Sequence, residues 1–467
     1  MHTLAATPAG PRQAPGFWME DAGEAPAHPV LESSLAVDVA VVGGGFTGLW
    51  TAYELLLREP SLRVAILERD RVGFGASGRN GSWCVPELNV GPRRLAEKFG
   101  KGRALDLYRA MCETTEAIGR TCEQEGIDAR FQQAGMLLVA RGRQQIPALR
   151  SAYREYRDSG LGDHHRWLGR QETQALVAVN GAEHGIYTPD GATLHPGRLV
   201  LGLAEVVRRR GAEIYEGTSV TGVIPGRRPR VLTPRGEVAA KAVVLALEAY
   251  LCELPGYHRR VLPIYSLIDL TEPLTQEQLA QIHWNRRICL ASMRLTVDYL
   301  ALTSDRRVVV GGRGAPYRFG SGIDRRTEVH PATHSGLRAM FYEWFPQLAG
   351  VRFTHSWGGV LGMPRDWIPR VSYSPRTGVG LSYGYTGHGV ATARLAGAAL
   401  ADLISERRSA LTELPIINRQ DRGWEPEPLR WLGVRYVQGQ LARLDARGER
   451  GGRPPSGRTI AERLAAH

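Results

Sequence analysis

The amino-acid sequence predicts a mixed α/β (α+β) fold, in which a Rossmann-like domain is assembled from separated segments and a β-rich antiparallel-sheet domain is inserted between them. Residues 37–68 follow the order strand, glycine turn, helix, strand. Residues 378–406 return to a strand, a glycine turn and a long apolar helix, and residues 263–354 are dominated by short β-type runs. Because alternating strands and helices build a parallel sheet, we expect the two outer patterns to complete one domain.

The most specific signal is the glycine-rich turn of the first segment. An apolar run at 37–42 leads into Gly43-Gly44-Gly45-Phe46-Thr47-Gly48, and a second apolar run at 64–67 ends on Glu68. This is the dinucleotide-binding fingerprint in its full context of strand, Gly-x-Gly-x-x-Gly, helix, strand and acid. A second match at 73–78 follows a charged turn instead of a strand, so we interpret it as a loop.

Each part of the fingerprint has a physical role. Gly43 permits the tight turn out of the strand, Gly45 lets a pyrophosphate approach the backbone, and Gly48 lets the helix pack close to the sheet. The helix N-terminus attracts phosphates, and the Glu68 carboxylate is placed to accept hydrogen bonds from ribose hydroxyls and to repel a 2′-phosphate. The expected dinucleotide contacts are Gly43, Gly45, Phe46, Thr47, Gly48, Glu68 and Arg69.

The remaining elements follow from hydrophobic periodicity and turn residues. Residues 1–36 have no periodicity and are interpreted as an arm, and the last sixty or so residues are rich in Pro and Arg. Expected helices lie within 92–157 and at 199–210, 333–344 and 459–464; expected strands lie at 135–139, 212–215, 220–224, 231–233, 242–247, 264–270, 299–303 and 308–311.

Composition describes an ordinary globular protein of 467 residues, with 43% hydrophobic and 23% charged residues. No apolar run approaches the ~20 residues that cross a bilayer, and the N-terminus lacks the pattern of a secretory signal. We therefore expect a cytoplasmic protein without a membrane span. Reduced thiols suit that location, because the cysteines are odd in number and scattered: Cys84, Cys112, Cys122, Cys252 and Cys289.

Charge and histidine spacing exclude two further classes of function. The net charge is +12, but the basic residues are spread along the chain and no basic motif is interleaved with aromatic residues, so we expect no nucleic-acid partner. We also expect no metal site, because His164 and His165 are adjacent, which is the wrong spacing for two ligands on one helix face. The sequence leaves the oligomeric state open.

Six motifs in order resemble the D-amino-acid oxidase/glycine oxidase-like (DAO) family of FAD-dependent oxidoreductases, closest to the branch of γ-glutamylputrescine oxidoreductase-like enzymes. The resemblance covers about 37–404, and its motifs lie at 43–48, 76–81, 191–196, 243–246, 309–313 and 384–390. It implies an FAD-binding domain at 37–91, 190–262 and 355–410, a substrate domain at 92–189 and 263–354, an N-terminal arm at 1–36 and a C-terminal tail at 411–467.

The resemblance also implies which residues hold the flavin. The loop at 77–81 wraps the pyrophosphate and ring, the strand at Val220 offers backbone to adenine, and the turn before the helix ending near 404 faces the pyrimidine edge. Ser82 stands where relatives often carry another glycine, and no cysteine follows Cys289, so we expect FAD to be bound without a covalent link. The implied contacts are Ser77, Gly78, Arg79, Asn80, Gly81, Val220, Gly359, Gly387, His388, Gly389 and Val390.

The expected activity is oxidation of a primary or secondary amine at its C–N bond, by hydride transfer to FAD with oxygen or another electron acceptor, giving an imine that hydrolyses. Leu361 stands where amino-acid oxidases of this family carry an arginine that binds the substrate carboxylate, and Arg365 follows four residues later. The first alternative is an enzyme that oxidises an amino acid or an N-methyl amino acid. A lower-ranked alternative is an NAD-dependent dehydrogenase or a non-catalytic flavoprotein. The catalytic residues stay unknown, with pocket candidates His388, Arg313, Tyr265, Tyr299 and Trp357.

Overall fold

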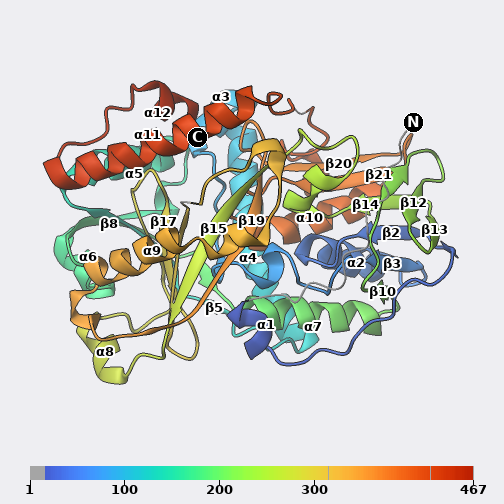
Figure 1. The fold of residues 1–467 in the computed structure, drawn as a ribbon, viewed down its shortest axis with the longest axis horizontal. Helices are drawn as coiled ribbons and strands as arrows, with labels where there is room; N and C mark the ends of the chain where they lie inside the picture. Colours follow the sequence, from blue (N-terminus) through green and yellow to red (C-terminus); the bar gives the residue numbers. More distant parts are fainter. Residues whose placement is uncertain (1–15, 314, 421, 466–467) are drawn as a thin grey trace.

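The computed structural model of this protein describes residues 16–313, 315–420 and 422–465, so the first fifteen residues of the expected arm lie outside it. Two large sheets organise the described chain (Figure 1). A six-stranded sheet lies on the right of this view, in the order β10-β3-β2-β14-β21-β20. An eight-stranded sheet lies on the left, in the order β19-β15-β18-β17-β16-β6-β8-β7. We call these parts the six-strand lobe and the eight-strand lobe.

The six-strand lobe contains the parallel sheet that the sequence predicts. β2 pairs in parallel with β3 and β14, and every residue of these three strands is buried. Strands that are apolar on both faces are typical of parallel sheets covered by helices, here α2, α7 and α10. The elements are β2 (Val39–Val42), α2 (Phe46–Arg58), β3 (Val64–Leu67), α7 (Pro196–Arg209), β10 (Glu213–Tyr215), β14 (Ala242–Leu245), the antiparallel edge strand β20 (Arg370–Ser374), β21 (Val379–Tyr383) and α10 (Gly389–Ile404).

Smaller elements surround this lobe. A four-stranded sheet joins β1 (Leu35–Ala36), β13 (Gly236–Ala239), β12 (Arg230–Thr233) and β11 (Gly222–Ile224). A three-stranded sheet joins β4 (Trp83–Cys84), β9 (Ala192–Thr193) and β5 (Gln132–Gln133). The helices α3 (Pro92–Phe99) and α4 (Lys101–Glu125) follow, and the buried face of α4 joins the same core as α2 and α10.

The eight-strand lobe is antiparallel except for the pairing of β16 with β6. Its own core packs under α9, around Phe341 and Trp344. The elements are β6 (Met136–Arg141), α5 (Ile146–Asp158), β7 (Arg166–Leu168), α6 (Arg170–Leu176), β8 (Ala182–Thr188), β15 (Leu262–Thr271), α8 (Gln276–Gln281), β16 (Cys289–Ser292), β17 (Asp298–Leu302), β18 (Val308–Arg313), α9 (Pro331–Trp344) and β19 (Phe353–Met363).

Most expected elements are confirmed, with boundaries that shift by a few residues. The strand expected at 220–224 begins only at Gly222, where pairing with β12 starts, so Val220 lies in the loop before β11 and not in the strand. The division into domains stays a prediction. β19 begins close to the boundary expected at 355 but pairs with β15 in the eight-strand lobe, and α4 packs in the six-strand lobe.

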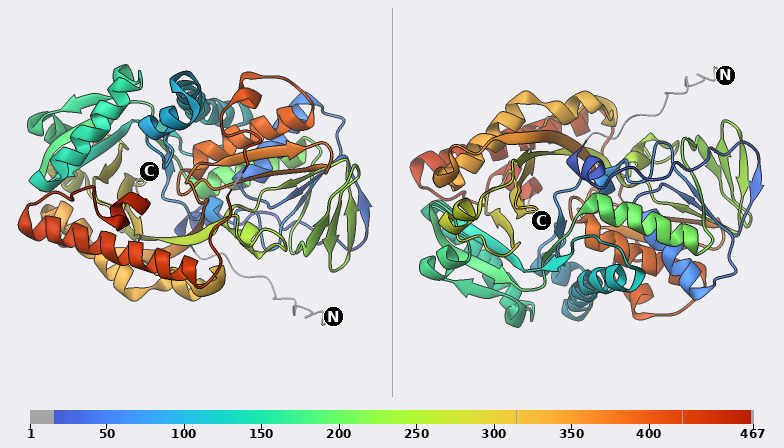
Figure 2. Two further views of the ribbon diagram at one scale, coloured as in Figure 1. Left: turned by 90° about the horizontal axis from the view of Figure 1, so that it is seen from above. Right: turned by 90° about the horizontal axis from the view of Figure 1, so that it is seen from below.

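Both ends of the chain carry more structure than their composition indicates. The arm contains α1 (Phe17–Asp21), whose Phe17 and Trp18 are buried. The Pro- and Arg-rich end contains a 23-residue helix, α11 (Leu429–Gly451), before the expected short helix, α12 (Ile460–Ala465). Figure 2 shows α11, in red, lying over the eight-strand lobe. Within the described ranges, no helix is long and apolar enough to cross a bilayer.

Candidate active site

The glycine turn between β2 and α2 has the geometry that the fingerprint predicts. Gly43 has φ +110°, and a Cβ there would lie 2.6 Å from the carbonyl oxygen of Ala246. A Cβ on Gly48 would overlap the carbonyl oxygen of Gly43. The first amides of α2 have no partner within the helix, and that of Phe46 donates to Ser77 Oγ at 2.8 Å. The turn and the expected flavin loop therefore meet at a helix N-terminus, which is a favourable place for phosphate.

Glu68 holds the glycine turn from the end of β3. Its Oε2 accepts the amide of Gly44 at 2.7 Å and its Oε1 accepts the amide of Asp70 at 2.9 Å. Burial raises the pKa of Glu68 to about 6. A carboxylate has further lone pairs for ribose hydroxyls beyond these two bonds. The neighbouring Arg69 is instead paired with Glu253, at 2.7 Å.

The loop that begins at Ser77 is held by its own side chains. The Asn80 amide group donates to the Ser77 carbonyl at 2.9 Å and accepts the amide of Ser82 at 3.0 Å. Ser82 has φ +72°, the left-handed conformation that favours glycine, and its hydroxyl donates to the Leu194 carbonyl at 2.5 Å. The backbone at this position therefore follows a path that a glycine would adopt without strain.

Arg79, in the same loop, is a buried cation with spare donors. Its side chain is 1% exposed and its Nη1 lies 2.8 Å from Glu328 Oε1, while its guanidinium stacks 4.5 Å over the Phe74 ring. Nε and Nη2 are buried and find no hydrogen-bond partner among the described residues. Buried N–H groups are almost always paired, so these two donors, together with the glycine cradle, fit a bound group rich in acceptors such as FAD.

The N-terminal helix α1 and β19 support this loop from outside. Trp18 Nε1 donates to the carbonyl of Asn80 at 2.8 Å, and Trp357 Nε1 donates to the carbonyl of Arg79 at 2.9 Å. The two indoles and Phe17 form one buried cluster. Trp357, which we expect to line the pocket, thus also supports the loop backbone. The role of Trp18 in holding this loop has one sequence signal, the adjacent aromatic residues Phe17 and Trp18 in an arm that is otherwise rich in Ala and Pro.

A buried acid that the sequence analysis missed, Glu248, fixes the turn before α10. Its carboxylate accepts the amides of Gly362 at 2.5 Å, Gly384 at 3.0 Å and Tyr385 at 2.9 Å. The hydroxyl of Tyr385 also lies 2.8 Å from Thr47 Oγ1, in the first turn of α2. The two turns expected to contact FAD are therefore joined to each other and to β19.

The turn itself presents glycines and a neutral histidine. Gly387 has φ +105° and is exposed, and α10 begins at Gly389. Burial, reinforced by the nearby charge of Arg313, lowers the pKa of His388 to about 4, so its imidazole is neutral near pH 7. Val390 is buried in the core of the six-strand lobe. The helix N-terminus can stabilise negative charge on a reduced flavin.

Tyr299 lines the inner face of the eight-strand lobe. Its ring fills the space that Cβ atoms would take at Gly81 and Gly311, and its hydroxyl lies 3.0 Å from Ser266 Oγ. Burial raises its pKa to about 12. Gly359 lies on the same side, where a Cβ would sit 3.5 Å from the Cβ of Arg79.

Two predicted site residues are not brought to this face. Tyr265 belongs to the core on the other face of the sheet, and its hydroxyl bonds the backbone of Asp324 at 2.8 and 3.2 Å. Val220 packs at the edge of the apolar cluster that includes Val231 and Val238. Strand residues alternate between faces, and the sequence alone did not fix which face Tyr265 takes.

A large cavity lies between the eight-strand lobe and the C-terminal helices. Its volume is about 1020 Å³, and residues of α11 and α12 provide one wall. The opposite wall includes Ile264, Met363 and Trp367, and the end beside the turn before α10 includes Asn89 and Arg313. A cavity of this size suits a small-molecule substrate.

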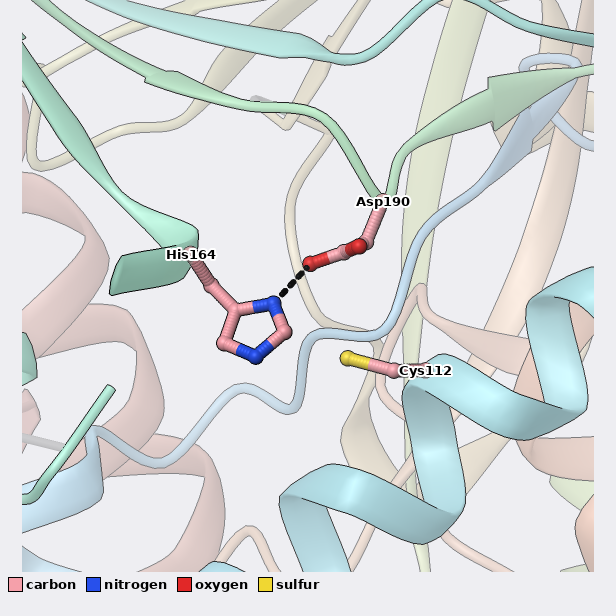
Figure 3. A group of neighbouring side chains, drawn as sticks. All are labelled: Cys112, His164 and Asp190. Atoms are coloured by element: carbon pink, nitrogen blue, oxygen red, sulfur yellow. Dashed lines mark hydrogen bonds and ion pairs between the residues drawn. The ribbon is translucent and has the colours of Figure 1, made fainter. Parts of the chain in front are cut away.

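Apart from this site, three possible metal-ligand side chains lie together, although their sequence positions are far apart. Cys112, His164 and Asp190 have ligand atoms within 4.8 Å of one another, and Figure 3 shows the Cys112 sulfur facing the other two. His164 Nδ1 lies 3.0 Å from Asp190 Oδ2, and burial with the nearby Asp190 charge raises the pKa of Cys112. The expected absence of a metal stays a prediction.

Comparison with known proteins identifies the family. Residues 38–403 match the family model DAO, described as FAD dependent oxidoreductase. The chain is 31% identical to γ-glutamylputrescine oxidoreductase of Escherichia coli (strain K12), over 82% of this chain and 88% of the relative. It is 26% identical to glycine oxidase of Geobacillus kaustophilus (strain HTA426), over 81% and 95%.

The solved structures agree on the fold. The crystal structure of glycine oxidase from Geobacillus kaustophilus matches with a TM-score of 0.69 at 23% identity, over 83% of this chain and all of the other. That of L-proline dehydrogenase from P. horikoshii matches with a TM-score of 0.68 at 19% identity, over 82% and 96%. With the glycine cradle and the unpaired donors of Arg79 in place, these findings show that the chain belongs to the DAO family of FAD-dependent oxidoreductases.

Proposed function

We propose that this enzyme oxidises a primary or secondary amine at its C–N bond. Bound FAD supplies the chemistry by accepting a hydride from the carbon next to nitrogen. Water then hydrolyses the resulting imine to a carbonyl compound and ammonia, for a primary amine, or a smaller amine, for a secondary amine. The 31% identical relative is named a γ-glutamylputrescine oxidoreductase, which supports an amine as the substrate.

The proposal depends on the identity of the side chain beside the turn before α10, which is Leu361. A Cβ built on Gly387 would lie 3.8 Å from Leu361 Cδ1, at the position where resemblance to amino-acid oxidases leads us to expect a carboxylate-binding arginine. Leu361 cannot pair with a carboxylate. Arg365 does not replace it, because its Nε lies 3.0 Å from Glu425 and its guanidinium stacks 5.2 Å over Trp424. An α-amino acid held in the manner of those oxidases is therefore disfavoured.

The roles that we assign to the chain are binding, orientation and charge stabilisation. The first amides of α2, with Glu68, hold the adenosine and pyrophosphate part of FAD; the loop at 77–81 holds the ring; and the amides at 387–389 stabilise charge on it. His388, being neutral, leaves a neutral amine undisturbed beside the ring. No proton transfer by a side chain is required before the hydride leaves.

Oxidation of an amino acid or N-methyl amino acid remains the second candidate. It is favoured by a different residue, Arg313, whose cation borders the cavity next to Gly387. Glycine oxidase and sarcosine oxidase subunit beta are also among the relatives, at 26% and 24% identity. For the location, we propose the cytoplasm, where the five cysteines, all free in the structure, would stay reduced.

The deciding experiment is anaerobic reduction. The purified protein is loaded with FAD and mixed without oxygen with primary amines, secondary amines, amino acids and N-methyl amino acids while the flavin spectrum is followed. We expect bleaching by one amine class, with one carbonyl product per flavin. A protein that takes up no FAD, or whose FAD is reduced by none of these compounds, would contradict the proposal. Readmitted air then separates an oxidase, which recovers its colour quickly, from a dehydrogenase.

A further inference from the structure

A second cavity, of about 310 Å³, lies between segments of the two lobes. The six-strand lobe contributes the start of α7, and the eight-strand lobe contributes the segment that enters β16 and the turn between β17 and β18. Among the described residues, this cavity shares no lining side chain with the cavity beside the turn before α10. Three of its lining side chains are arginines, Arg130, Arg198 and Arg287. Arginine is the residue that most often binds oxygen-rich anions, so this wall has the composition of an anion site.

Arg287 has no carboxylate partner among the described residues. Its Nε donates to Gln132 Oε1 at 2.5 Å and its Nη2 donates to the Arg130 carbonyl at 2.6 Å, and both acceptors are neutral. Nη1 makes no hydrogen bond to the described residues. Burial, together with the neighbouring charge of Arg130, holds the pKa of Arg287 below its usual range. A partly buried charge with neutral partners is stabilised when an anion reaches its remaining donor.

Arg130 and Arg198 share a single carboxylate. Arg130 Nη2 and Arg198 Nη1 each lie 3.1 Å from Asp128 Oδ2. Arg198 Nε is buried and finds no hydrogen-bond partner among the described residues. Its Nη2 lies 3.8 Å from Asp21 Oδ2, beyond hydrogen-bond distance. Both arginines therefore keep donors that no described residue satisfies.

The acids around the cavity leave one positive charge over. Asp305 is paired with Arg307 at 2.7 Å. Asp21 lies 3.1 Å from His195 Nε2, and burial lowers the pKa of His195, so its imidazole is neutral near pH 7. The charged residues that line the cavity, with their described ion-pair partners, are four arginines and three carboxylates: Arg130, Arg198, Arg287, Arg307, Asp21, Asp128 and Asp305. An anion that reaches Arg287 therefore meets a positive environment.

We propose that this cavity binds a phosphate group, as inorganic phosphate or as part of a small phosphorylated compound, between Arg130, Arg198 and Arg287. The spare donors come from three side chains on different segments, which suits the tetrahedral oxygens of phosphate. A planar carboxylate is bound by the fork of one guanidinium. The volume of about 310 Å³ leaves room for a short carbon skeleton beside the phosphate. This inference does not rest on the proposed amine oxidation.

The test titrates the FAD-loaded protein by calorimetry with inorganic phosphate and with ethyl phosphate, in chloride buffer at constant ionic strength. Loading with FAD keeps the N-terminus of α2 from taking up the probes. We expect saturable binding of at least one probe and no binding of ethanol. Tighter binding of ethyl phosphate assigns the site to phosphorylated compounds, and tighter binding of inorganic phosphate assigns it to the free ion. Succinate that binds more tightly than both probes overturns the choice of phosphate.

Arg287→Gln should weaken binding of the probes about 10- to 150-fold, the effect of removing a hydrogen bond between charged groups. Arg287→Lys, which keeps the charge, should lose less. Arg130→Gln is a second variant, chosen because its side chain is half exposed and its replacement disturbs little packing. It should weaken phosphate binding as well.

Arg286→Gln is the matched control. It removes the same charge one residue away, from an exposed side chain that does not line the cavity, and it should leave phosphate binding unchanged. No saturable binding of either probe by the wild type overturns the proposal. So does equal binding by the wild type and Arg287→Gln, or an equal loss in Arg287→Gln and Arg286→Gln, which would assign the effect to net charge. Melting temperatures of the variants verify that each one folds.

Discussion

Replacing Glu328 by Gln tests whether the flavin loop is held by a buried ion pair between the two lobes. Arg79 comes from the loop after β3, and Glu328 comes from the short 3-10 helix Arg325–Val329 of the eight-strand lobe. Their side chains are only 1% and 4% exposed, and their charged atoms lie 2.8 Å apart. Glutamine keeps the shape of the side chain and removes only the charge. The variant therefore leaves the Arg79 cation buried without its carboxylate.

The size of the expected effect follows from the burial of both partners. Removing one partner of a buried pair costs about 3–5 kcal/mol, because the other charge stays desolvated. Unfolding entropy is about 2.1 cal/mol/K per residue, so a chain of 467 residues that unfolds as one unit would lose about 3–5 °C of melting temperature. FAD should reduce this loss, because the unpaired Nε and Nη2 of Arg79 would then have acceptors.

The assay compares urea and thermal unfolding of the wild type and Glu328→Gln, each with and without FAD. Glu116→Gln is the matched control, since Glu116 pairs with Arg120 at 3.2 Å with both side chains at least half exposed. Its loss should cost less than about 1 kcal/mol. A Glu328→Gln protein that is destabilised no more than Glu116→Gln refutes the buried pair. A loss of the same size with and without FAD refutes the contact of Arg79 with the cofactor.

Four further outcomes are expected. Gly48→Ala should abolish FAD uptake, measured by the flavin absorbance of the purified protein, because its Cβ would overlap the Gly43 carbonyl. Trp18→Ala should destabilise the protein by about 3–5 kcal/mol in urea unfolding and weaken FAD binding, because it removes the donor to the Asn80 carbonyl. His388 has a folded pKa of about 4, below the ordinary 6.5, so its contribution to stability is present above pH 6.5 and is lost as pH falls toward 4; in urea unfolding from pH 4 to 8, His388→Asn should flatten that decline. Metal analysis of the purified protein should find well below one ion per chain, and a stoichiometric ion would assign the Cys–His–Asp group of Figure 3 as a metal site.

The features that the sequence predicts correctly are local. The features that it does not predict depend on contacts between segments that are distant in the chain. The fingerprint at 43–48 and its acid specify their own geometry, because glycine positions, helix start and strand ends lie within one short stretch. Glu248 carries no such signal. It is a single acid after a buried strand, and its role exists only because the amides of Gly362, Gly384 and Tyr385 converge on it.

Composition misled the expectation for the two ends of the chain. Pro and Arg residues indicated a tail at 411–467, yet α11 forms there with few buried residues of its own. Asp445 shows what holds it: its carboxylate accepts the amides of Leu295 and Thr296 at 3.0 and 2.9 Å, which fixes the helix to a loop of the eight-strand lobe. A helix that is stabilised by capping another segment need not have a regular apolar stripe, so periodicity alone underestimates it.

Helix α11 belongs to a part of the chain that lines the cavity but does not contribute to the expected FAD site. The glycine turn, the flavin loop and the turn before α10 lie within 38–403, the stretch shared with the family. The outer wall of the cavity comes from beyond it, through α11 and α12. Arg294 with Glu449, and Arg365 with Glu425, tie that wall to the eight-strand lobe. If the cavity receives the substrate as we propose, changes in the C-terminal segment should alter which amine fits without moving the turns that we expect to hold FAD. Arg313, on the shared strand β18, stays beside the turn before α10 in either case.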